Sequence, residues 1–168
     1  MVIILPALVG FTAPQEQVAD KRKLFERTSQ IVLATVSEAK LDAASGEVSY
    51  LFVADKVIKG DPIKTFNIVG DPLRYPEEAK TFQDHQDQKF WDGPDGRCSH
   101  HTDGKIYPSF AVGETYLIFL DKPYHNKSFE LIQKLGDKPE SRDKWLQWVE
   151  SQIGAEQAVP PKSDRAGG

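Results

Sequence analysis

The sequence predicts a mainly β fold, a five-stranded barrel with flanking N- and C-terminal helices and a long loop excursion between strands 3 and 4. Two observations lead to this prediction. Five short hydrophobic segments are separated by turn residues, a pattern typical of small antiparallel β folds. Residues 70–109, in contrast, show little hydrophobic periodicity and are rich in Asp, Gly, Pro, His and Gln, which indicates a long loop.

The first predicted elements are a helix and a long strand. Residues 15–29 place Val18, Leu24 and Phe25 near one face of a helix, and most of the other positions are charged or polar. Residues 31–41 start as a continuous apolar run and then alternate between apolar and polar. We therefore expect a strand that leaves the core at its far end.

Two further strands follow, joined by a tight turn. The third strand is predicted over 63–69, where Phe66 and Ile68 share a face. The turn at 59–62 contains Gly60, which tolerates positive φ, and a proline, which fixes its own φ. The second strand is predicted over 47–57, and its core-facing side is expected to consist of Val48, Tyr50, Phe52 and Ala54.

The fourth strand, residues 112–120, is apolar at consecutive positions. A strand that is apolar on both faces is buried on both, so we expect the barrel interior on one side and a helix on the other. Gly113 is expected to form a tight turn near its start. The two faces of this strand are Tyr116, Ile118 and Leu120 on one side, and Leu117 and Phe119 on the other.

The last predicted elements are a fifth strand over 128–135 and a C-terminal helix. Asp137 and Glu140 have the spacing of a capping box, which predicts a helix that runs from there to about Ile153. Trp145, Trp148, Val149 and Gln152 share one face of this helix. We expect the two tryptophans to pack on the barrel.

These elements together describe an OB-type barrel. With 168 residues and a hydrophobic content of 39%, we expect one domain over residues 14–153. Residues 154–168 have the composition of a disordered tail. Residues 1–13 are apolar, uncharged and too short to cross a bilayer as a helix. We interpret them as the remnant of a secretory signal, the alternative being an N-terminal strand or arm packed on the barrel.

The negative net charge of the chain indicates which classes of partner are disfavoured. The formal net charge is -4, and the pI is about 5.6. Nucleic acids and anionic membranes reward a basic surface, so this balance argues against binding to either. Exposed aromatic side chains with basic neighbours would be needed for an oligonucleotide, and the strand aromatics instead fit core positions. We expect a protein partner and no nucleic acid.

Four motifs follow one another along the chain: the strand at 31–36, the segment 53–60 (VADKVIKG), Cys98, and the segment 110–119 (FAVGETYLIF). This succession resembles the netrin-like family, the OB-fold superfamily of the tissue inhibitors of metalloproteinases. The family includes many bacterial exported proteins of unknown role. The resemblance covers roughly residues 20 to 135 and is carried by short structural motifs. Ile58 stands where family members have an aromatic residue, and no glycine follows Cys98.

The resemblance implies an exported, extracytoplasmic protein, either periplasmic or secreted. In the animal inhibitors an N-terminal cysteine chelates the catalytic zinc of the protease, and disulfides hold that segment in place. This chain has no cysteine before Cys98, so that mechanism does not carry over. The first functional hypothesis is therefore a non-catalytic protein-binding or interaction module. Protease inhibition by a mechanism that uses no N-terminal cysteine is a further alternative.

A second hypothesis concerns the long loop, where three of the four histidines and the only cysteine occur. Imidazole and thiolate are good ligands for zinc or copper, so a four-coordinate site is predicted from His85, Cys98, His100 and His101 in the 84–101 loop. The alternative is a polar, solvated loop whose histidines are incidental.

Catalysis is not expected. A Cys98–histidine nucleophile pair would need an oriented base and oxyanion donors, and the sequence indicates neither. The chain also contains no phosphate-binding glycine loop, no serine-nucleophile elbow and no His-Glu-x-x-His motif. The sequence therefore predicts no enzyme and no obligatory cofactor.

Overall fold

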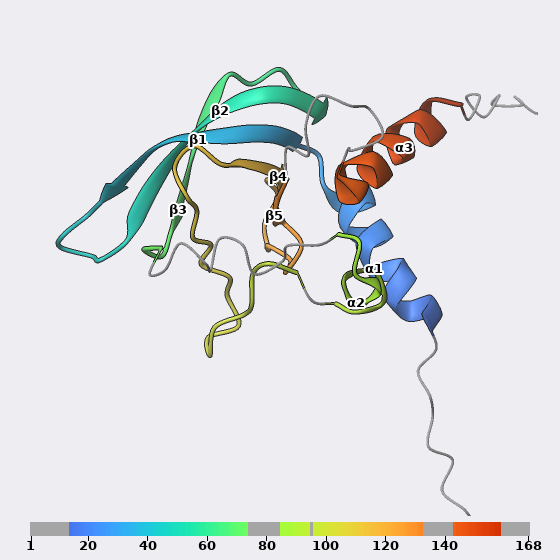
Figure 1. Ribbon diagram of the computed structural model, residues 1–168, viewed down its shortest axis with the longest axis horizontal. Helices are drawn as coiled ribbons and strands as arrows, with labels where there is room; N and C mark the ends of the chain where they lie inside the picture. Colours follow the sequence, from blue (N-terminus) through green and yellow to red (C-terminus); the bar gives the residue numbers. More distant parts are fainter. Residues whose placement is uncertain (1–13, 74–84, 95, 133–142, 159–168) are drawn as a thin grey trace, which may run out of the picture.

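The computed structural model describes residues 14–73, 85–94, 96–132 and 143–158 of the chain. Five strands and three helices are found in this part (Figure 1). All five expected strands are present, and the mainly β class is confirmed. In chain order the elements are α1 (Pro14–Arg27), β1 (Ile31–Leu41), β2 (Val48–Lys59), β3 (Thr65–Gly70), α2 (Gln88–Asp92), β4 (Thr115–Phe119), β5 (Phe129–Leu131) and α3 (Lys144–Ala158).

The strands form one antiparallel sheet in the order β3-β2-β1-β4-β5. β1 lies at its centre and pairs with β2 along nearly its whole length and with β4 along its first half. β3 and β5 lie at the two edges, and no pairing joins them within the described residues. The sheet is therefore not closed in this part of the chain, and the predicted barrel is not confirmed.

β1 and β2 form a long hairpin that projects from the body of the protein (Figure 1). β1 is buried from Ile31 to Val36, apart from half-buried Leu33 and Thr35, and is exposed from Ser37 onward. This confirms the expectation of a strand that leaves the core at its far end. The hairpin tip consequently carries an apolar side chain into solvent, because Leu41 is 58% exposed.

One hydrophobic core, the inner core, lies on one face of the sheet. Its rings include Phe52, Phe110 and Tyr116, which contact one another edge to face with centroids 4.9 to 6.4 Å apart. The predicted faces of β2 and β3 both contribute to it. The buried members of the inner core are Val32, Ala34, Val36, Val48, Tyr50, Phe52, Ile68, Cys98, Ile106, Phe110, Tyr116, Ile118, Phe129 and Leu131.

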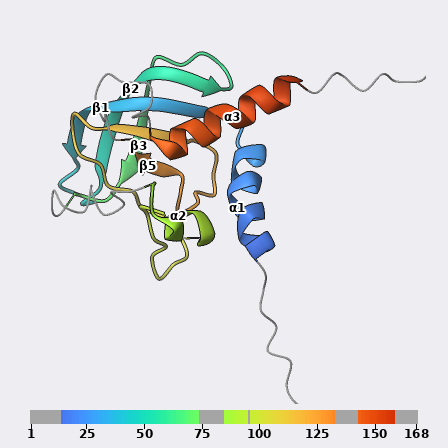
Figure 2. The same cartoon turned by 45° about the vertical axis from the view of Figure 1, so that its right-hand side comes forward.

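A second core, the helix-side core, lies on the other face of β4. Leu117 and Phe119 belong to it, so β4 is buried on both faces as its sequence predicts. The helices gather at one end of the sheet in both views (Figures 1 and 2). Trp145 and Trp148 of α3 stack with their ring centroids 5.0 Å apart and pack in this core, which confirms the expected role of the two tryptophans. Besides Trp145, Leu117 and Phe119, its buried members are Leu24, Phe25, Ile31, Phe90, Ile132 and Val149.

Two glycines have the positive φ that their turns require, as expected. Gly60 has φ +96° and Gly113 has φ +87°. At Gly60 the backbone also approaches the start of β1, because a Cβ there would lie 2.3 Å from Oε1 of Gln30. The side-chain amide of Gln30 donates to the carbonyl oxygen of Asp61 and accepts from its N–H, both at 2.9 Å. These contacts fix the β2–β3 turn against β1.

Several element ends differ from the predicted ones. β4 begins at Thr115, because Gly113 and Glu114 form a turn that still bonds to Val36 of β1. α3 continues beyond Ile153 to Ala158, so residues 154–158 are helical and the prediction of a disordered tail that begins at 154 is wrong for them. The predicted capping box at 137 and 140 lies outside the described residues, as do residues 1–13 and the tail after 158. None of the helices described has the length and apolar character that a membrane span requires.

Candidate functional site

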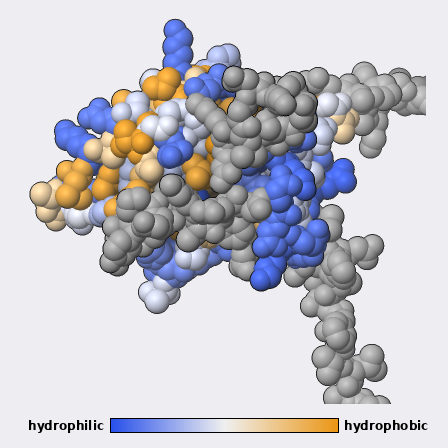
Figure 3. All heavy atoms as spheres, in the orientation of Figure 1, coloured by the Kyte–Doolittle hydropathy of each residue, from blue (hydrophilic) through white to orange (hydrophobic). Residues whose placement is uncertain are grey.

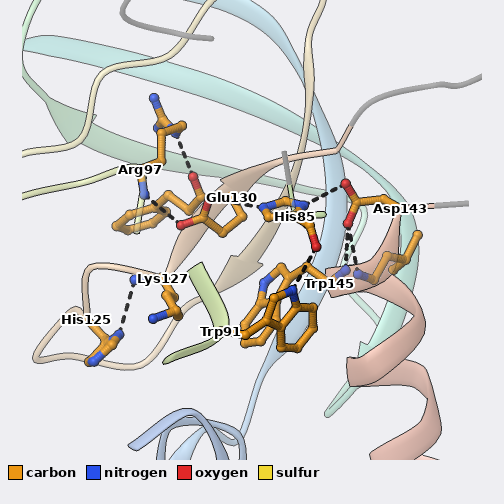
Figure 4. Close-up of polar contacts among 10 residues, drawn as sticks. His85, Trp91, Arg97, His125, Lys127, Glu130, Asp143 and Trp145 are labelled. Carbon is orange, nitrogen blue, oxygen red and sulfur yellow. Dashed lines mark hydrogen bonds and ion pairs between the residues drawn. The ribbon is translucent and has the colours of Figure 1, made fainter. Parts of the chain in front are cut away.

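A buried group of charged side chains lies where α2, β5 and α3 meet (Figure 4). His85 precedes α2, Glu130 lies on β5 and Asp143 precedes α3. Nδ1 of His85 lies 2.6 Å from Oδ2 of Asp143, and Nε2 lies 3.3 Å from Oε2 of Glu130. All three residues are nearly inaccessible to solvent, with exposed fractions of 4%, 0% and 7%. The imidazole therefore bridges two buried carboxylates.

Local structure explains why these carboxylates are buried. Glu130 is paired with Leu117 across the β4–β5 ladder, so it lies on the face of the sheet that the helices cover. Asp143 is the N-cap of α3, and its Oδ1 accepts hydrogen bonds from the N–H groups of Trp145 at 2.8 Å and Leu146 at 3.2 Å. Each acid is thus held in place by its own secondary-structure element, independently of its contact with His85.

The two carboxylates determine the protonation of His85. Burial alone would lower the pKa of the imidazole, but the hydrogen bonds and negative charges of Asp143 and Glu130 outweigh burial and raise the pKa to about 9. Both ring nitrogens therefore carry protons at neutral pH and donate to the acids. Oε1 of Glu130 also accepts from the backbone N–H of Arg97 at 2.8 Å, which occupies its second oxygen.

This arrangement is suited to holding elements together and not to reacting with a ligand. A general base needs a free ring nitrogen within reach of substrate, and both nitrogens of His85 are occupied by carboxylates. The indole N–H of Trp91 in α2 donates to the carbonyl oxygen of His85 at 2.7 Å. We therefore interpret the His85–Glu130–Asp143 group as a structural junction between α2, β5 and α3.

The four predicted metal ligands lie in different surroundings. His85 belongs to the junction, whereas Cys98 is part of the inner core. Burial raises the pKa of the Cys98 thiol to about 11, against the opposing effect of Arg97, so the thiolate that metals require is disfavoured. His100 and His101 are exposed, and Nε2 of His101 lies 3.4 Å from Oδ2 of Asp71.

No group of three or more His, Cys, Asp or Glu side chains arranged to hold a metal ion is found among the residues described. The four-ligand zinc or copper site stays a prediction without geometric support. Sequence reasoning missed Glu130 and Asp143 as the partners of His85. Asp143 could have been found from its place two residues before Trp145, at the start of the apolar helical pattern. The burial of Glu130 had no sequence signal, because a polar residue in an alternating strand is expected to face solvent.

A surface groove is lined by the residue that precedes β2, the end of β3, and the segments around Tyr107 and Lys122. It has a volume of about 700 Å³, which is within the range of binding clefts. A smaller hollow of about 440 Å³ lies beside the hairpin tip, and the two share Glu47 and Val69. We call the two together the hairpin groove. Its larger part is lined, among the described residues, by Glu47, Val69, His100, Gly104, Lys105, Ile106, Tyr107, Lys122, Pro123 and Tyr124.

The hairpin groove combines apolar, aromatic and basic side chains. Leu41 and Val69 line it and are 58% and 54% exposed. In the space-filling view, hydrophobic residues on the visible face gather over β1, β2 and β3, whereas α1 is hydrophilic (Figure 3). Nζ of Lys122 lies 5.6 Å from the ring centroid of Tyr124, which places a cation at the groove wall.

Comparison with known proteins finds no matching family model and no matching curated protein. The resemblance to the netrin-like family therefore stays a prediction. The residues of the junction and of the hairpin groove are the structural basis on which a function can be proposed.

Proposed function

We propose that this protein is a non-catalytic protein-binding module and that its partner binds in the hairpin groove. The observation that supports this most directly is the exposure of large apolar side chains. Four such side chains are exposed among the described residues, and two of them, Leu41 and Val69, line the groove. Exposed apolar side chains that gather beside polar ones are typical of interaction surfaces.

The titratable groups of the chain support a non-catalytic role. The most strongly perturbed histidine, His85, is buried between two carboxylates, and the single thiol, Cys98, is buried in the inner core. Neither lines the hairpin groove. The groove offers apolar, aromatic and basic contacts instead, which suit recognition of another chain.

We further infer a partly open OB-type barrel, as in the netrin-like family, and an extracytoplasmic location. The strand order supports the barrel, because it leaves β3 and β5 as the two edges that a curled sheet would bring toward each other. Phe66 packs against the inner core from β3, and Phe129 belongs to it from β5. The apolar residues 1–13 support export through a secretory signal. Sequencing the N-terminus of the mature protein tests the signal.

Affinity capture with matched surface variants tests the binding function. The protein is immobilised and exposed to an extract of its source cells, and the same capture is done with Leu41→Glu combined with Val69→Glu. Val112→Glu is the control, because Val112 is equally exposed at 58% but does not line the groove. A partner retained by the control and lost by the double variant supports the proposal. Equal capture by all three proteins contradicts it.

A further inference from the structure

Among the described residues, the outer edge of β3 carries backbone groups that pair with no other strand. The N–H of Ala54 donates to the carbonyl oxygen of Lys64 at 2.9 Å, which makes these two residues a hydrogen-bonded pair of the β2–β3 ladder. Hydrogen-bonded pairs recur at every second residue of an antiparallel ladder. Phe66, Ile68 and Gly70 therefore bond to β2. The N–H and C=O groups of the three alternate residues of β3 point away from the sheet, namely those of Thr65, Asn67 and Val69.

These outward groups have no hydrogen-bond partner among the described residues. The next outward residue along the chain is Asp71, whose N–H donates to the carbonyl oxygen of Pro108 at 3.1 Å. At Gly70 the two segments approach so closely that a Cβ would clash with the same oxygen. The outward groups are thus paired at Asp71, beside Pro108, and are unpaired among the described residues from Val69 back to Thr65.

The open edge borders the hairpin groove. Val69 lines both parts of the groove, and Ile106 and Tyr107 line its larger part. The side chains of Thr65, Asn67 and Val69 are all exposed. A second chain that pairs with β3 would therefore form hydrogen bonds with the outward backbone groups of β3. Near Val69 it would also contact side chains of the groove.

We propose that an extended segment of a partner protein binds by adding a strand to the outer edge of β3, with an apolar and an acidic side chain directed into the hairpin groove. This inference rests on the proposed binding function and specifies its mode. Main-chain hydrogen bonds supply affinity in such strand addition, and pockets for alternate side chains supply specificity.

The lining of the groove favours an acidic segment. Among the described residues, Lys105 and Lys122 line its larger part together with His100, and Glu47 is the one acidic residue of that lining. Among the described residues Lys122 makes a contact with the ring of Tyr124 and no ion pair, so its charge is available to a ligand carboxylate. Val69, Ile106 and the ring of Tyr107 offer apolar surface for the other side chain.

The test uses an array of short synthetic peptides of random sequence and the full-length protein. We expect the binding peptides to carry an apolar and an acidic residue two positions apart, because alternate side chains of a strand share a face. At alternate backbone nitrogens, each single N-methylation should weaken a selected peptide about tenfold, because the methyl group removes one main-chain hydrogen bond. Methylation of the intervening nitrogens should have little effect.

A matched pair of variants addresses the same edge from the protein side. Asn67→Pro removes the outward N–H and leaves the bonds to β2 intact, because proline is tolerated on an edge strand. Asn67→Ala changes the same side chain and keeps the N–H. We expect about tenfold weaker peptide binding for the proline variant and little change for the alanine variant, with the thermal unfolding of both confirming that they fold.

Three results would overturn the proposed mode: no peptide binds, N-methylation has no alternating effect, or Asn67→Pro binds as well as Asn67→Ala. The charge component is tested with Lys122→Glu, which should weaken the acidic peptides and not neutral ones. These results are separable from the capture experiment. A protein partner lost with Leu41→Glu and Val69→Glu but unaffected by Asn67→Pro would retain the binding function and refute strand addition.

Discussion

Asp143 uses its two carboxylate oxygens for two different elements. Oδ2 accepts a hydrogen bond from Nδ1 of His85 at 2.6 Å, and Oδ1 accepts from the backbone N–H of Trp145 at 2.8 Å. One side chain therefore caps α3 and holds the residue that precedes α2. The docking of the two helices is coupled through this carboxylate.

The first prediction is that stability falls as pH rises from about 6.5 to about 9. The pKa of His85 is raised from 6.5 to about 9 in the folded protein. The folded state therefore binds more protons in this window, and its stabilisation is complete below pH 6.5 and is lost as pH rises through 9. The difference corresponds to about 3 kcal/mol. Chemical denaturation at a series of pH values measures it.

His85→Gln and His100→Gln provide the comparison for this prediction. His85→Gln leaves two buried carboxylates without a counter-charge and should lower the free energy of unfolding at pH 7 by about 3 to 5 kcal/mol. The free energy of unfolding of this variant should also lack the decline between pH 6.5 and 9 that His85 causes in the wild type. His100 is exposed, so His100→Gln should reproduce the wild-type curve. An unchanged pH dependence in His85→Gln would contradict the assigned role.

The second prediction separates the two roles of Asp143. Asparagine is also a good N-cap, so Asp143→Asn should keep the cap of α3 and lose the charge and the hydrogen-bond acceptor beside His85. Asp143→Ala should lose both and should be less stable than the asparagine variant by about 1 kcal/mol. Urea denaturation gives the two differences. Equal stability of the two variants would show that the cap makes no contribution.

The third prediction compares two glycines. A Cβ at Gly70 would lie 1.8 Å from the carbonyl oxygen of Pro108, whereas a Cβ at Gly154 would meet no atom within 4 Å. Gly70→Ala should therefore destabilise the protein by about 1 to 3 kcal/mol through overpacking. Gly154→Ala lies within helix α3 and should stabilise it by about 1 kcal/mol. Thermal unfolding should give shifts of opposite sign.

The fourth prediction concerns the reactivity of Cys98. Its thiol is buried, and its pKa of about 11 keeps it protonated at pH 8. A thiol reagent should therefore label the native protein slowly and the unfolded protein completely. Mass spectrometry of both samples measures the difference. Rapid labelling of the native protein would show that the segment containing Cys98 opens readily.

The fifth prediction addresses the metal hypothesis. The thiol of Cys98 is buried, and both nitrogens of His85 are occupied, so we expect less than one zinc or copper ion per chain after equilibrium dialysis. The combined change His100→Ala and His101→Ala should leave the metal content unaltered. Stoichiometric binding that this double variant abolishes would revive the predicted site.

The faces predicted for β2 and β4 were right. Tyr50 and Phe52 point into the inner core, and Leu117 and Phe119 point to the helices, because alternation alone fixes which face a side chain occupies. Element ends were less predictable. The start of β4 depends on hydrogen bonds between the turn before it and Val36, which lies far away in the sequence.

The candidate sites were harder to predict for a related reason. His85 was expected in a loop, whereas the structure buries it between Glu130 and Asp143. These partners lie 45 and 58 positions away along the chain, so no local sequence pattern predicts the contact. The groove around Val69 depends on how the hairpin and the segment near Tyr107 lie together, and no local pattern encodes that.

β4 separates the two hydrophobic cores and contributes side chains to both. Neither core can therefore open without exposing this strand, so the sheet and its helices should unfold as a single cooperative unit. In native-state hydrogen exchange, the amide protons of Tyr116 and Ile118 should be among the last to exchange, and their rates should report the global free energy of unfolding.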